Sequence, residues 1–81
     1  MREFRSSLGD ALGEIETGTL TGARTIVVGR AWWEAQSSTE QKAAQMRCAD
    51  AGVQLSVDER LSRHLVEVRG DEPPLSSELR T

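Results

Sequence analysis

The chain offers few side chains of the types that catalysis or metal binding requires. His64 is the only histidine and Cys48 the only cysteine. A zinc site needs several His or Cys ligands at short spacings, so we expect no metal site. Cys48 lies among alanines in a segment that predicts a helix, whereas a reactive thiolate needs a positive setting or a helix N-terminus. We therefore expect Cys48 to be a small buried residue and His64 to lie at or near the surface.

Neither the acidic pairs nor the serines indicate a catalytic role. Asp58-Glu59 and Asp71-Glu72 fall in segments that predict a turn and a tail, whereas a carboxylate acting in acid–base catalysis needs a sheltered pocket. Serines at positions 37, 38, 56 and 62 fit helix caps or exposed sites. We predict no catalytic residue, no cofactor and no small-molecule substrate, so the chain is not expected to be an enzyme.

The size and charge of the chain limit which kinds of protein it can be. The chain has 81 residues and a net charge of −3, which is enough for one domain with a small core. Its longest aliphatic run is Ile26-Val27-Val28, far short of the ~20 residues that span a bilayer. Residues 24–69 carry seven basic and six acidic residues, a balance that argues against a polyanion-binding surface. With no predicted signal peptide and a lone thiol, we expect a cytoplasmic protein that does not enter membranes.

Hydrophobic spacing predicts two helices and a long strand. Apolar residues at positions 4, 8, 11, 12 and 15 form one stripe of a helix over 2–17. Residues 24–35 are rich in β-branched and aromatic side chains and predict a strand. Ser37 and Glu40 fit a capping box, which predicts a helix over 39–51 whose inner side is built of small residues.

The rest of the chain is less clearly patterned. Alternation at Val53, Leu55 and Val57 predicts a short strand. Residues 56–69 fit either a capped helix or a strand over 63–69, and the β-branched Val66 and Val68 favour the strand. Residues 1–69 are therefore expected to form a single α+β domain, with an antiparallel or mixed sheet of three to four strands and two helices, and residues 70–81 a flexible tail.

The adjacent tryptophans, Trp32 and Trp33, suggest where a partner binds. On a strand their indoles point to opposite faces of the sheet. The helix over 39–51 can cover one face. Either the helix over 2–17 covers the other face, or both helices share one face and leave an apolar patch, which on a soluble protein usually marks a binding surface.

These patterns favour a non-catalytic protein–protein interaction. We expect a small regulatory, adaptor or inhibitor protein of bacterial or phage type that binds a protein partner or forms a homodimer. The predicted partner-binding residues are Trp32, Trp33, Arg30 and Val27, because tryptophan is enriched at binding hot spots. Three acidic residues of the first helix are available to steer a basic partner: Asp10, Glu14 and Glu16.

A DNA-binding regulator is the alternative. If residues 56–69 are helical, the order of strand 25–35 and two helices resembles a ribbon–helix–helix dimer, which reads the major groove with paired strands. That strand offers only Arg30 as a plausible base-reading side chain. A helix-turn-helix around residues 48–65 places Asp58 where an inward apolar residue is expected. Nucleic acid is therefore the less favoured partner.

Overall fold

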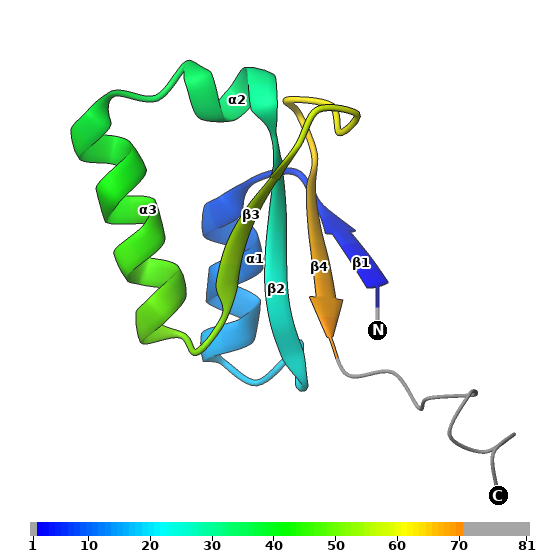
Figure 1. Cartoon of the computed structure of the whole chain (residues 1–81). Helices are drawn as coiled ribbons and strands as arrows, with labels where there is room; N and C mark the ends of the chain where they lie inside the picture. Colours follow the sequence, from blue (N-terminus) through cyan, green and yellow to red (C-terminus); the bar gives the residue numbers. More distant parts are fainter. Residues whose placement is uncertain (1, 71–81) are drawn as a thin grey trace, which may run out of the picture.

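A four-stranded mixed sheet with helices packed on one side forms the fold (Figure 1). The computed structural model describes residues 2–70. In chain order its elements are β1 (Arg2–Arg5), α1 (Leu8–Glu16), β2 (Ala23–Gly29), α2 (Arg30–Glu34), α3 (Ser38–Asp50), β3 (Gln54–Asp58) and β4 (Val66–Gly70). The predicted α+β class with a single domain is confirmed. Gly70 still belongs to β4, and the remainder of the predicted tail lies outside the described residues.

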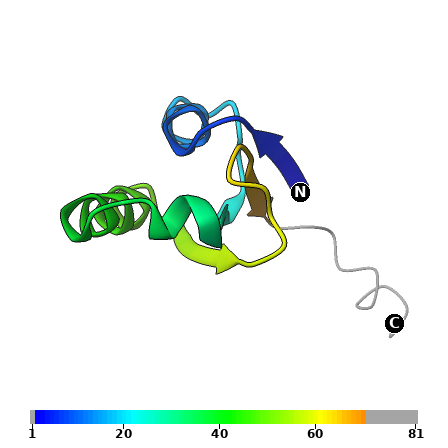
Figure 2. The same cartoon turned by 90° about the horizontal axis from the view of Figure 1, so that it is seen from above.

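The strand order explains why one face of the sheet carries both long helices. The order is β1-β4-β2-β3, with β2 parallel to β3 and β4 antiparallel to β1 and β2. The connections β1–α1–β2 and β2–α3–β3 therefore join parallel strands and advance across the sheet in the same direction. Since such crossovers are almost always right-handed, they place their helices on the same face. Figure 2 shows α1 and α3 on one side of the sheet.

A single core lies between that face and the two helices. Ile26 and Val28 of β2 and Val68 of β4 are fully buried there. The helices contribute a further group of buried residues to the same cluster, namely Leu8, Ala11, Leu12, Ala44 and Cys48. Of the two arrangements that the sequence left open, the structure has the one in which both helices share a face.

The N-terminal prediction is wrong in its first half. Residues predicted as the start of a helix over 2–17 form β1, which pairs antiparallel with β4. The helix begins only after Ser7, whose side chain accepts a hydrogen bond from the backbone N–H of Asp10. Pairing with a strand more than sixty residues away in the sequence outweighs the local apolar spacing. Phe4 therefore leaves the helical stripe and lies on the sheet.

The prediction of a strand over 24–35 is also wrong in its second half. β2 ends at Gly29, and Trp32 and Trp33 lie in the short helix α2. Neighbouring helical residues are about 100° apart around the axis, so both rings can reach the same core. Both indoles are half-buried against the core cluster, with ring centroids 6.4 Å apart. The two rings do not point to opposite faces of a sheet.

The predictions for the second half of the chain are largely confirmed. Ser37 and Glu40 form the capping box of α3, and the short strand that follows is β3. The ambiguous segment 56–69 contains the end of β3, a loop over 59–65 and most of β4, so no helix forms there. The ribbon–helix–helix and helix-turn-helix arrangements both need a helix in that segment. Neither arrangement is present in the described residues.

Candidate functional site

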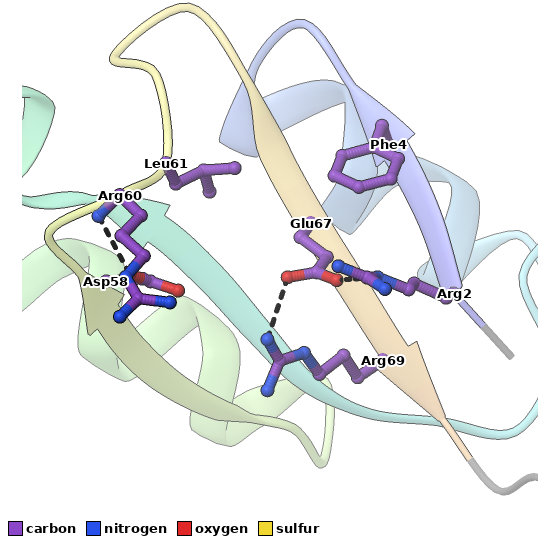
Figure 3. Close-up of a pocket in the computed structure, with 7 residues that line it drawn as sticks. All are labelled: Arg2, Phe4, Asp58, Arg60, Leu61, Glu67 and Arg69. Carbon is purple, nitrogen blue, oxygen red and sulfur yellow. Dashed lines mark hydrogen bonds and ion pairs between the residues drawn. The ribbon is translucent and has the colours of Figure 1, made fainter.

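The face of the sheet opposite α1 and α3 carries polar and charged side chains, and we call it the open face. The strand registers define two rows of residues on it. One row contains Arg2, Arg69, Thr25 and Gln54, and the next contains Phe4, Glu67, Val27 and Ser56. A concavity of about 410 Å³ lies on this face (Figure 3), lined by Arg2, Phe4, Asp58, Arg60, Leu61, Glu67 and Arg69.

Glu67 is the centre of this concavity. It is only 2% exposed, although its position on β4 faces away from the main core. One carboxylate oxygen, Oε2, accepts a hydrogen bond from Nε of Arg2. The other, Oε1, accepts a hydrogen bond from Nη2 of Arg69 at 3.0 Å. The carboxylate therefore holds two guanidinium groups in place, one from each of two paired strands.

The electrostatics keep this arrangement charged. Burial by itself raises the pKa of Glu67, but the hydrogen bonds and positive charges of Arg69 and Arg2 together outweigh burial and hold that pKa below its usual value. The hydrogen bond from Arg69 to Glu67 in turn raises the pKa of Arg69. The side chains of Arg2 and Arg69 remain 65% and 53% exposed. Since a guanidinium has five N–H donors, each arginine keeps donors that can bind an anion.

A loop over 59–65 builds the other wall. Its backbone crosses the end of β2 above Gly29, where a Cβ atom would lie 2.5 Å from the carbonyl oxygen of Leu61. The Asp58 side chain accepts a hydrogen bond from the backbone N–H of Arg60 at 2.8 Å, which fixes the start of the loop. The absent side chain at Gly29 therefore lets Arg60 and Leu61 lie beside the sheet.

Two apolar side chains also line the concavity. Phe4 is 45% exposed, and the guanidinium carbon of Arg2 lies 5.7 Å from its ring centroid. That distance fits a cation–π contact. Leu61 is half-buried and faces Phe4 across the concavity in Figure 3. The site thus combines anion-binding donors with apolar surface.

The structure does not bring the predicted partner-binding residues together. Val27 lies on the open face but is only 3% exposed. Arg30 begins α2 and forms an exposed ion pair with Glu59 at 3.0 Å. Trp32 and Trp33 pack against the core on the other side of the sheet. The sheet face with a tryptophan on it that the sequence predicts does not form, because the backbone at Trp32 and Trp33 is helical and not extended.

The acidic residues expected to steer a partner are mostly paired. Glu14 accepts a hydrogen bond from Nη2 of Arg5 at 2.9 Å, and this contact lowers the pKa of Glu14. Glu16 lies 3.9 Å from Arg47. Asp10 accepts a hydrogen bond from the hydroxyl of Ser6. These carboxylates mainly link α1 to neighbouring elements.

The residues of the concavity were not identified from the sequence. The sequence pattern places Phe4 in a helix and gives Arg2 no role. A usable signal exists in Val66–Arg69, where apolar and charged residues alternate and so place Glu67 and Arg69 together on one face of a strand. Their meeting with Arg2 depends on the β1–β4 pairing, which local patterns do not reveal.

Residues 2–70 contain neither a metal site nor a membrane-spanning helix. Among residues 2–70, no group of three or more histidine, cysteine, aspartate or glutamate side chains could hold a metal ion. No helix in that part of the chain is long and apolar enough to cross a membrane. Comparison with protein-family models, with curated proteins and with solved structures gives no match.

Proposed function

We propose that this protein is a non-catalytic interaction protein, which binds an acidic segment of a protein partner on its open face. The observation that supports this proposal is the pair of arginines, Arg2 and Arg69, fixed by the buried carboxylate of Glu67 on a face that neither α1 nor α3 covers. This role suits the small cytoplasmic regulatory or adaptor protein that the sequence favours. The proposed binding residues differ from those predicted, because the tryptophans pack half-buried against the core.

Fixing the arginines in advance favours binding. A free arginine side chain loses about 2 kcal/mol of rotamer entropy when a partner immobilises it. Arg2 and Arg69 are already held by Glu67, so part of that cost is met on folding. Glu67 is buried whereas both arginines are more than half exposed, and an ion pair is weak evidence for a purely structural role. We therefore assign this charged group a role in recognition in addition to its contribution to stability.

The local charge favours a partner with few negative groups. Within the concavity, three arginines (Arg2, Arg60 and Arg69) face two carboxylates (Asp58 and Glu67), which leaves a net charge of +1. The whole chain carries −3. Nucleic-acid binding requires several cationic contacts to phosphates, which this balance does not supply. An acidic protein segment needs only one or two guanidinium contacts.

Calorimetric titration of the full chain with octaglutamate at low ionic strength tests the proposal. We expect binding that Arg69→Gln weakens by about fivefold, corresponding to a partly exposed charge-assisted hydrogen bond. Arg47→Gln is the matched control, since Arg47 is similarly exposed on α3 and its loss changes the net charge equally. We expect the control to change affinity less than about twofold, the effect of a distant screened charge.

Two results would refute the proposal. One is an equal loss of affinity in the two variants, which would mean that octaglutamate responds only to net charge. The other is an oligothymidylate of similar length that binds more tightly than octaglutamate and depends on Arg69, which would indicate a nucleic-acid partner instead.

A further inference from the structure

The concavity on the open face is lined by both apolar and cationic side chains. Phe4 and Leu61 supply its apolar surface, and the guanidinium groups of Arg2 and Arg69 supply cationic surface beside Glu67 (Figure 3). Each carboxylate oxygen of Glu67 accepts one hydrogen bond from these guanidinium groups. A ligand that fills the concavity must therefore present one apolar group and one anionic group to the same side.

The strand register sets the distance between these groups. Phe4 pairs with Glu67, and Arg2 pairs with Arg69, so the apolar and cationic rows are two residues apart along β1 and β4. Two residues of an extended chain span about 6.6 Å, and their side chains point to the same side. An extended peptide lying along the strands repeats the same spacing. Its side chains at positions i and i+2 can then reach both rows.

We infer that the open face recognises an extended segment of a protein partner in which an apolar and an acidic residue stand two positions apart. The inference rests on the proposed function and adds the pattern that the partner must carry. The apolar side chain packs between Phe4 and Leu61. The carboxylate accepts hydrogen bonds from the unused N–H groups of Arg2 and Arg69. One carboxylate suffices, because the lining residues leave a net charge of +1.

Four short peptides, capped at both ends and flanked by glycines, test the pattern in NMR titrations of the full ¹⁵N-labelled chain. Their central sequences are Leu-Ser-Glu, Leu-Ser-Gln, Ala-Ser-Glu and Leu-Glu-Ser. We expect Leu-Ser-Glu to bind about fivefold more tightly than each of the others, a difference of the size of one lost charged or apolar contact. Leu-Glu-Ser has the same composition but directs its two side chains to opposite sides.

A pair of variants assigns the apolar contact. Phe4→Ala should abolish the preference for Leu-Ser-Glu over Ala-Ser-Glu, and the exposure of Phe4 means that the fold tolerates the change. Met46→Ala is the control, since Met46 is an exposed apolar residue on α3, 67% exposed. We expect this control variant to keep the preference.

The outcomes separate this inference from the proposed function. If octaglutamate binds through Arg69 but Leu-Ser-Glu binds no better than Ala-Ser-Glu or Leu-Glu-Ser, the spacing pattern is wrong and the proposed function stands. If neither octaglutamate nor any of the four peptides binds, the proposed function fails as well. Loss of the preference in Met46→Ala would also overturn the assignment to Phe4.

Discussion

Gly29→Ala is expected to destabilise the fold by about 3 kcal/mol, the upper part of the usual range for inserting a group into packed surroundings. The new Cβ atom would lie 2.5 Å from the carbonyl oxygen of Leu61 and 3.0 Å from that of Ser62. Both are backbone atoms, so no side-chain rotation relieves the contact. The loop over 59–65 must move away from β2, which also displaces Arg60 and Leu61 from the concavity. Urea unfolding followed by tryptophan fluorescence measures the loss.

Gly13→Ala provides the matched control. A Cβ at Gly13, within α1, meets nothing within 4 Å. Because alanine is favoured over glycine inside a helix, this variant should be more stable than the parent chain by up to about 1 kcal/mol. If Gly29→Ala unfolded at the same urea concentration as the parent chain, the close approach of the loop to β2 would be incorrect.

The second large effect concerns Glu67 and is pH-dependent. Because the folded state lowers the pKa of Glu67, its ionised form stabilises the fold above the unfolded pKa, and that contribution is lost as the pH falls through the folded value. At pH 7, Glu67→Gln should cost about 1–2 kcal/mol. This cost is smaller than the cost of breaking a fully buried ion pair, because water can solvate Arg2 and Arg69 once the carboxylate is absent. The difference in unfolding free energy between the parent chain and this variant should shrink steadily below about pH 4.3, the usual glutamate value.

Glu59→Gln serves as the reference for that measurement. Glu59 is 74% exposed and, within residues 2–70, pairs with the exposed Arg30, so its loss should change stability by less than about 0.5 kcal/mol. Glu14 and Glu40 also have lowered pKa values, because Arg5 and the N-cap residue Ser37 bind their charged forms. Both residues are present in every variant, so their pH-dependent contributions to stability cancel in the difference between the parent chain and a variant. A gap between the parent chain and Glu67→Gln that stayed constant from pH 7 to pH 3 would argue against an ionised Glu67.

The sequence predicts the elements whose determinants are local. The α3 helix follows from its capping box, with Ser37 and Glu40 bonded reciprocally as expected, and from the small residues on its buried side. Alternation likewise locates β3. Cys48 is buried as predicted, and burial raises the pKa of its thiol. His64 is exposed, as expected.

The features that the sequence does not predict, β1 and the end of β2, depend on contacts between residues that are far apart in the chain. β1 exists because it pairs with β4, and β2 ends at Gly29, where the loop over 59–65 packs on the backbone. The same long-range contacts build the concavity, since Arg2 and Glu67 are separated by 65 positions. Neither the periodicity of hydrophobic residues nor helix-capping residues predict such long-range pairings. The proposed binding residues therefore lie on the open face and not at the tryptophans.

Mapping where an acidic ligand binds tests the central claim most directly. In ¹H–¹⁵N spectra of the full chain titrated with octaglutamate, the open-face account predicts the largest shifts at backbone amides of β1, β4 and residues 58–62 and at the side-chain Nε–H groups of Arg2 and Arg69. Signals of α3 should stay unchanged. Shifts centred on α3 or on Trp32 and Trp33, with the open face unaffected, would contradict it.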